Sequence, residues 1–253
     1  MVSFTSCLAT DSGSFFLEVS PQETKKNSSI LVMQADFLNL MDFQEFYEQV
    51  LKIKNLPLPG SDSHHKMSPA FRKQWLESKK IEAQNPKKAG VMALFYPNAS
   101  QNTQLLLILR KTYQGVHSNQ IAFPGGKEEP EDKSILETAL RETHEEVGIP
   151  PTSVEVVKEL SEVYIPPSNF LVQPHIGLYP KPESFQIQES EVESVVEVLL
   201  SDFLDGSNLS EEKLSTSYAK NISVPAFKLN GYIVWGATAM MLSEIKELLE
   251  QVL

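Results

Sequence analysis

Apolar residues recur every three or four positions in three separate stretches of the chain, residues 42–51, 134–147 and 236–253. This spacing gathers them on one side of a helix, as in helices that pack against a core. A more polar helix is predicted over residues 71–81, because Ser68-Pro69 precedes it and proline is favoured in the first helical turn. The helices before residue 85 are expected to cover one side of the core, with a lid or a homodimer contact as the alternative.

Shorter runs rich in β-branched and other apolar residues predict β-strands between these helices. They cover residues 90–96, 104–110, 154–160, 170–179, 194–200, 222–228 and 232–234. Asn230-Gly231 supplies a hairpin turn between the last two strands, whereas residues 164–169 and 211–220 are expected to be irregular. Strands on both sides of a central helix, followed by a closing helix, indicate an α/β fold with a mixed β-sheet between helical layers.

Composition changes along the chain and predicts its organisation. Residues 1–36 are rich in serine and threonine and have no sustained apolar period, which is typical of a flexible N-terminal extension. Residues 37–253 are predicted to form a single domain, with a helical lead-in over residues 37–85 and the core over residues 86–253.

Charge and cysteine content argue against several classes of function. The formal net charge of −11 argues against the clustered basic surface with which proteins bind nucleic acid. The single cysteine, Cys7, excludes an internal disulfide framework and fits a reducing compartment. No apolar run is long enough for a transmembrane helix, and residues 1–24 hold no lysine or arginine to open a secretory signal. We therefore expect a cytoplasmic protein that binds neither nucleic acid nor membrane.

The central helix has local signals at both ends. Ser134 followed three residues later by Glu137 is a capping box, in which side chains satisfy the free N–H groups of the first turn. Gly148 can adopt the left-handed conformation that ends a helix, and Pro150 cannot continue one. These residues predict where the helix begins and ends.

Three glutamates lie on one face of this helix. Glu142, Glu145 and Glu146 stand at i, i+3 and i+4 beside the apolar stripe, so they are expected to be half-buried. Clustered carboxylates without a matching set of lysines suit a hard divalent cation such as Mg²⁺ or Mn²⁺. A solvated acidic face is the alternative. His144 projects about half a turn away and is expected at the surface.

The sequence before the helix favours the metal-binding interpretation. Phe123-Pro124-Gly125-Gly126 precedes the helix, which itself carries Arg141-Glu142-x-x-Glu145-Glu146-x-Gly148. Together these residues resemble the Nudix box. The loop departs from the family pattern at Asp132, which lies nine residues before Arg141, one more than usual, and replaces the usual glutamate. The resemblance implies a Nudix-type α/β/α sandwich and hydrolysis of a nucleoside diphosphate linked to another group.

The resemblance also implies roles for individual residues. Four groups would bind Mg²⁺ or Mn²⁺: the side chains of Glu142, Glu145 and Glu146 and the carbonyl of Gly126. Arg141 would orient a box glutamate by ion pairing. The general base would be Glu145 or, from a later loop, Glu191.

Residues upstream of the box resemble one branch of the family, the coenzyme A diphosphatases. An apolar strand ends at Arg110, and twelve residues lie between Arg110 and the FPGG sequence, as in this branch. The segment Trp235–Ala239 is also similar to the branch. Residues 174–177, which include His175, add further likeness; His175 is itself expected to be a hydrogen-bonded histidine of the core or sheet edge. Four residues are candidates for substrate binding: Arg110, Lys111, Phe123 and Gly125.

The implied substrate is therefore coenzyme A or a thioester of it, a small molecule that would yield phosphopantetheine and adenosine 3′,5′-bisphosphate. Its 3′-phosphate needs a cationic neighbour, for which Arg110 and Lys111 are the nearest candidates. The alternative is that both are surface cations at a strand end. An ADP-ribose or dinucleotide diphosphatase on the same fold is the second hypothesis, and a non-catalytic Nudix ligand sensor is the third.

Overall fold

A computed structural model describes residues 42–69, 72, 85–111, 120–215 and 221–253. The chain divides into two units, Met1–Phe37 and Leu38–Leu253, and every described residue belongs to the second. The predicted N-terminal extension and nearly all of the helix predicted over residues 71–81 lie outside the described residues. Within the described part of the chain, no helix is long and apolar enough to span a lipid bilayer.

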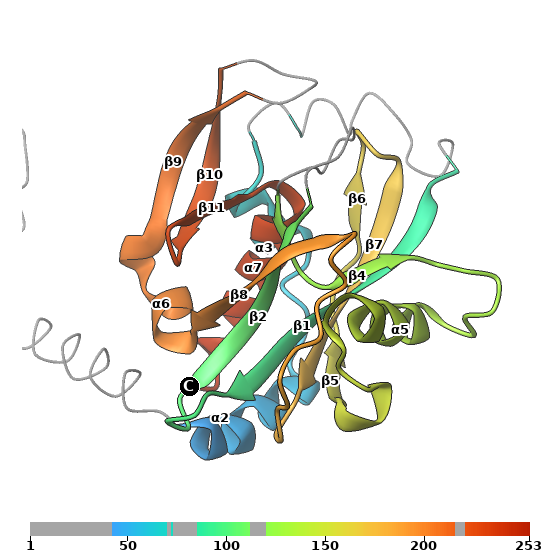
Figure 1. Ribbon diagram of the computed structural model, residues 1–253. Coiled ribbons are helices and arrows are strands. Elements are labelled where there is room, and N and C mark those ends of the chain that lie inside the picture. The colour runs from blue at the N-terminus through green and yellow to red at the C-terminus, as the bar shows by residue number, and fades with distance from the viewer. Residues whose placement is uncertain (1–41, 70–71, 73–84, 112–119, 216–220) are drawn as a thin grey trace, which may run out of the picture. The chain divides into compact units, whose positions relative to one another are not determined.

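Eight strands form one mixed sheet (Figure 1). Its main path runs β3-β2-β1-β7-β5, whereas β4 also pairs with β1, β6 with β7 and β8 with β2. The parallel pair β1–β7 adjoins pairings that are all antiparallel, so the predicted mixed sheet is confirmed. The strands are β1 Lys87–Pro97, β2 Thr103–Arg110, β3 Ile121–Ala122, β4 Gly125–Lys127, β5 Glu155–Glu159, β6 Val163–Ile165, β7 Phe170–Leu178 and β8 Val192–Leu199.

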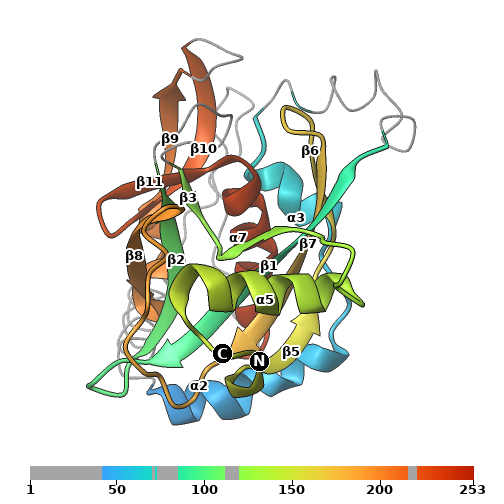
Figure 2. The ribbon, with the colours of Figure 1, turned by 45° about the vertical axis from the view of Figure 1, so that its right-hand side comes forward.

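The strands divide their side chains between two cores, one on each face of the sheet. On β1, Met92 and Leu94 lie in the core beneath α5 (Ile135–Val147), as period-two alternation requires. Ala93 and Phe95 belong to the opposite core, with α2 (Phe43–Val50) and α7 (Gly236–Leu249). Figure 2 shows α5 across one face of the sheet and α7 on the other side. The predicted helical layers are thus confirmed.

Capping residues begin α2 and α5 and end α5 where the sequence predicts, whereas α7 ends at Leu249 instead of residue 253. Ser134 Oγ accepts a hydrogen bond from Glu137 N at 3.2 Å, and Glu137 Oε2 accepts one from Lys133 N at 2.9 Å. Gly148 ends α5 with a φ of 78°. At α2, Asp42 Oδ1 accepts from Glu45 N at 2.8 Å. These bonds satisfy N–H groups that have no partner within the helix.

A second sheet corrects one prediction. The strands β9 (Leu209–Leu214), β10 (Ile222–Leu229) and β11 (Tyr232–Trp235) pair in the order β11-β10-β9. Residues 211–214 are therefore strand rather than loop. Their side chains are mostly polar and give no apolar signal, and β9 is ordered instead by its backbone pairing with β10. The predicted hairpin between β10 and β11 is confirmed, with Asn230 and Gly231 at positive φ.

Two short elements, one helix and one strand, were not predicted from the apolar pattern. Helix α3 (Ser61–Lys66) is absent from the predicted helices. Tyr164 and Ile165 belong to β6 rather than to an irregular segment, and only residues 166–169 form a turn. The remaining elements are α6 (Leu200–Leu204) and the 3₁₀ turns η1 (Leu51–Asn55), η3 (Pro151–Ser153) and η4 (Gly206–Asn208).

Candidate active site

The box begins with a glycine strand that lies directly under the acidic face of α5. Strand β4 pairs with β1, which places Gly126 opposite Gly90. A Cβ on Gly126 would overlap the carboxylate of Glu142. The absence of a side chain at Gly126 therefore lets the backbone of β4 lie close to the Glu142 carboxylate.

The three box glutamates have different environments. The side chain of Glu145 is 55% exposed, that of Glu142 is 15% exposed and that of Glu146 is 1% exposed. Glu146 Oε2 accepts a hydrogen bond from Gly125 N at 2.8 Å, and Glu146 Oε1 lies 3.2 Å from Arg110 Nη1. The face is thus graded from solvent to core, rather than uniformly half-buried.

Arg141 ties the loop to the helix. Its Nε and Nη2 donate to the two oxygens of Asp132, each at 2.9 Å, and its Nη2 also donates to Lys127 O at 3.1 Å. Its Nη1 donates to Glu142 Oε1 at 3.1 Å and to Glu145 Oε2 at 3.0 Å. The guanidinium therefore holds two box glutamates, as bidentate arginine geometry permits.

The extra loop residue does not displace Asp132 from this network. Besides Arg141, Asp132 Oδ2 accepts from Thr138 Oγ1 at 2.8 Å and from Glu129 N at 3.0 Å. The Arg141 guanidinium holds the pKa of Asp132 well below its usual range, and these two further donors act in the same direction. Asp132 is accordingly an ionised partner of Arg141 inside the loop.

Burial raises the pKa of the two deeper glutamates. It raises the pKa of Glu146 to about 7, although Arg110 and the Gly125 N–H oppose the rise. It also raises the pKa of Glu142, against the opposing effect of Arg141. The charge of Glu191 raises the pKa of both glutamates, so Glu191 lies near enough to act on them although it is exposed in the turn before β8.

The donor set matches a hard divalent cation in chemistry. Glu142 and Glu146 are carboxylates with raised pKa values beside two backbone glycines, an environment that a cation would relieve. Among the described residues, no three His, Cys, Asp or Glu side chains converge closely enough to enclose a metal ion. A metal ion bound here would therefore need further ligands, and Mg²⁺ commonly takes them from substrate phosphate oxygens and water.

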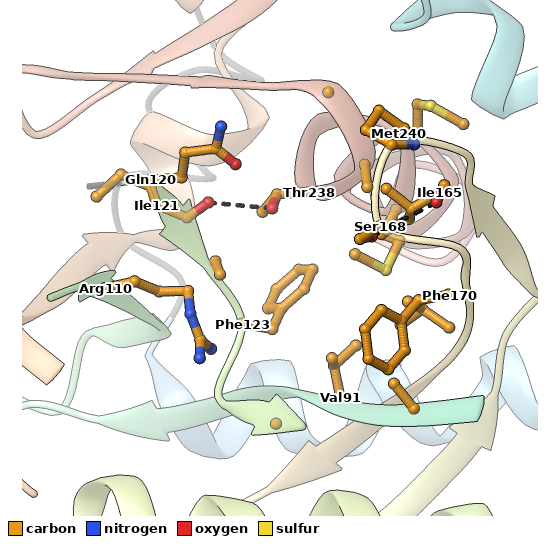
Figure 3. A pocket seen from close by; sticks show the side chains of 18 of the residues that line it. Val91, Arg110, Gln120, Ile121, Phe123, Ile165, Ser168, Phe170, Thr238 and Met240 are labelled. Carbon is orange, nitrogen blue, oxygen red and sulfur yellow. Dashed lines mark hydrogen bonds between the residues drawn. The ribbon is translucent and has the colours of Figure 1, made fainter. Parts of the chain in front are cut away.

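A cavity of about 350 Å³ adjoins the box. Arg110, Gln120, Gly125 and Gly126 are among the residues that line it. Thr238, near the start of α7, donates a hydrogen bond to Ile121 O at 3.0 Å (Figure 3). In this view the Phe123 ring stands between Arg110 and an apolar region. Val91, Ile165, Phe170 and Met240 form part of that region.

Only some of the residues predicted to bind substrate or metal line this cavity. Arg110, Phe123, Gly125 and Gly126 line it, whereas Lys111 is outside the described lining and its Nζ forms an exposed ion pair with Glu193 Oε2 at 2.8 Å. The apolar walls on β6, β7 and α7 were not predicted, because their residues read in sequence as ordinary core positions. Trp235–Ala239 was singled out, and residues 235–238 of it do line the cavity.

The prediction for His144 is confirmed, whereas the prediction for His175 is wrong in part. His144 is exposed, as predicted. His175 is buried on β7, but the prediction that it is hydrogen-bonded is wrong, since neither ring nitrogen has a hydrogen-bond partner among the described residues. Sequence alternation locates such a side chain in the core without revealing what surrounds it.

Comparison with known proteins gives the following similarities. Residues 86–213 match the family model described as NUDIX domain. The chain is 36% identical over 150 residues to an "Uncharacterized Nudix hydrolase NudL" of Yersinia enterocolitica, a match that covers 56% of this chain and 72% of that protein. It is 35% identical over 143 residues to a protein of the same name from Photorhabdus laumondii, covering 56% and 75%. A solved structure, a Nudix hydrolase from M. Smegmatis, RenU, is 17% identical with a TM-score of 0.45, covering 66% of this chain and 88% of that one.

Proposed function

The chain belongs to the Nudix family and is a hydrolase of phosphoanhydride bonds, and we propose that its substrate is coenzyme A or a coenzyme A thioester. The products would be phosphopantetheine, acylated when the substrate is a thioester, and adenosine 3′,5′-bisphosphate. The observation that carries the proposal is the apolar region of the cavity beside the box. A long, weakly polar chain can fill such a region, whereas a second nucleotide would bury polar groups there without partners.

Nudix hydrolases generally use divalent metal ions, and Mg²⁺ or Mn²⁺ is the proposed ion here. Its protein ligands would come from Glu142, Glu145, Glu146 and the Gly126 carbonyl, and substrate phosphate oxygens and water would complete the set. When bound, the ion neutralises the diphosphate and lowers the pKa of water in its shell.

The remaining functional groups would act by orientation and proton transfer. Arg141, with four acceptor residues around it, would keep Glu142 and Glu145 in fixed directions. The exposed carboxylate of Glu145 is the proposed general base, because water can reach it. Glu191 is the second candidate, supported by its electrostatic effect on Glu142 and Glu146.

A substrate panel with purified protein and Mg²⁺ or Mn²⁺ tests the proposal. We expect a higher kcat/KM for coenzyme A and its thioesters than for ADP-ribose or a dinucleotide. Including dephospho-coenzyme A reports whether the protein recognises the 3′-phosphate. Recognition through a charge-assisted contact would separate the two substrates by roughly ten- to a hundredfold.

Three results would contradict the proposal. A preference for ADP-ribose or for a dinucleotide would move the chain to another substrate class within the family. Binding of nucleotides without metal-dependent turnover would indicate a ligand sensor. A Glu146→Gln variant that keeps near-normal kcat would remove the metal assignment, since loss of a preorganised charged group costs about a hundredfold or more.

Composition predicts a cytoplasmic location without nucleic acid or membrane partners, and these remain predictions. The homodimer also remains a prediction, which a measurement of molecular mass in solution would test.

A further inference from the structure

Arg110 points to the helix face of the sheet because of its place in strand β2. Leu106 and Ile108, four and two residues earlier, lie in the core beneath α5. Side chains on a strand alternate between faces, so Arg110 follows them to the same side. There its Nη1 lies 3.2 Å from Glu146 Oε1.

The backbone at Arg110 is hydrogen-bonded to the residues that immediately precede β3 and β8. Arg110 N donates to Gln120 O at 3.0 Å, and Lys111 N donates to Glu191 O at 2.8 Å. The register with β8 shifts at this point, from Leu109 opposite Ser194 to Arg110 opposite Val192, so β8 carries one extra residue. Bulges of this kind are common beside active sites, where they redirect a side chain.

Glu146 has a defined partner for each carboxylate oxygen. Oε2 accepts from Gly125 N at 2.8 Å and Oε1 from Arg110, and the side chain is only 1% exposed. A buried carboxylate without a countercharge is strongly unfavourable, so the ion pair stabilises this arrangement. Each oxygen has two lone pairs and keeps one free, so the carboxylate can still bind a metal ion.

We propose that Arg110 is a positioning residue that holds Glu146 in the direction from which it binds the divalent ion, and that it does not recognise the substrate's phosphates itself. The inference rests on the proposed metal-dependent hydrolysis at this site. It replaces the expectation that Arg110 reads the 3′-phosphate of coenzyme A. The role resembles that of the hydrogen-bond partners that orient metal ligands in other proteins.

Mn²⁺ binding measured by isothermal titration calorimetry, on protein without substrate, tests this role. We expect Arg110→Met to raise the Kd for Mn²⁺ by about 10- to 100-fold, the range found when a partner of a metal ligand is removed. Arg110→Lys should recover part of the affinity, because it restores the charge without the planar fork. Lys228→Met is the matched control: it removes a cation from a 2.9 Å pair with Glu212 on the second sheet and should leave Mn²⁺ affinity unchanged.

Steady-state kinetics separate positioning from substrate binding. At saturating Mn²⁺, Arg110→Met should lower kcat while the KM for the substrate stays close to that of the wild type. In a Glu146→Gln background the same substitution should lower kcat no further, because its effect acts through Glu146.

Two results would overturn the inference. Unchanged Mn²⁺ affinity with a raised substrate KM would make Arg110 a substrate-binding residue, and tighter Mn²⁺ binding would make it a competitor of the metal. If melting curves show that Arg110→Met does not fold, Arg110→Gln and Arg110→Lys carry the same comparison. A wild type that does not hydrolyse coenzyme A would defeat the proposed substrate, whereas the Mn²⁺ titration would still decide the role of Arg110.

Discussion

His175 is a buried titratable residue that the proposed chemistry does not use. The nearest carboxylate oxygen, Glu159 Oε2, lies 3.7 Å from its Nε2, too far for a hydrogen bond. Burial lowers the pKa of His175 from its ordinary value of 6.5, and the charge of Glu159 opposes this only in part. The folded protein therefore keeps this imidazole neutral under conditions in which the unfolded chain protonates it.

His175→Leu should remove a pH dependence of stability. As pH falls below about 6.5, the unfolded wild type binds a proton that the folded state excludes, so its free energy of unfolding decreases. Relative to the variant, the wild type should lose up to about 1.4 kcal/mol per pH unit in this window. Urea unfolding of both proteins between pH 7.5 and 5.5 measures the difference, and parallel stability curves would contradict the assignment.

At the scale of elements, the contact between α5 and β1 is the one that positions the box. Gly90 on β1 lies beneath the helix: a Cβ there would be 2.9 Å from Ala139 N and still closer to Ile135 O. Both atoms belong to the α5 backbone, which cannot turn aside as a side chain can. Because β4 pairs with the same stretch of β1, this contact sets the distance between Gly126 and the box glutamates.

Gly90→Ala should therefore lower both stability and activity. The added methyl group would push α5 away from the sheet, and overpacking of this kind costs about 1–3 kcal/mol. Gly206→Ala is the control, because Gly206 has negative φ and open space around its Cβ position. Thermal melting and kcat should fall together in Gly90→Ala and change little in Gly206→Ala. Equal melting temperatures in the two variants would mean that the helix accommodates the methyl group.

Across the whole folded unit, Glu244 on α7 joins segments that lie far apart in the sequence. It is fully buried and accepts hydrogen bonds from Gly60 N, His64 Nε2, Ser161 N and Ser161 Oγ. Burial raises the pKa of Glu244, but the bonds from His64 and Ser161 more than offset this and leave the pKa below its ordinary value. Helix α3 with its N-cap Gly60 and the β5–β6 connection are thus joined to α7 by one carboxylate.

Glu244→Ala should destabilise the protein by about 3–5 kcal/mol, since it leaves several buried donors without an acceptor. Glu250→Ala, at the C-cap of the same helix, removes a half-exposed partner of Lys246 and should cost about 0–1 kcal/mol. Urea unfolding at pH 7 compares the two variants. A loss of stability below about 1 kcal/mol in Glu244→Ala would show that water hydrogen-bonds the donors that have lost Glu244.

The sequence by itself determined the parts of this protein that depend on neighbours along the chain. The start of α5 at Ser134, its end at Gly148 and the hairpin turn at Asn230-Gly231 follow from local hydrogen bonding and backbone preferences. The common face of Glu142, Glu145 and Glu146 follows from helix geometry alone. The family resemblance predicted the box and its chemistry, because the box residues lie in one continuous segment, where their spacing can be read directly.

Only the tertiary structure decided what each of these residues meets. The same helical face carries Glu145 at 55% exposure and Glu146 at 1%, because the glycine strand covers one edge of it and solvent the other. The pairing of Arg110 with Glu146, the ordering of β9 by β10 and the burial of Glu244 each join segments distant in the chain. Such contacts depend on how the layers pack, and the periodicity of a single segment carries no information about its partner across the core.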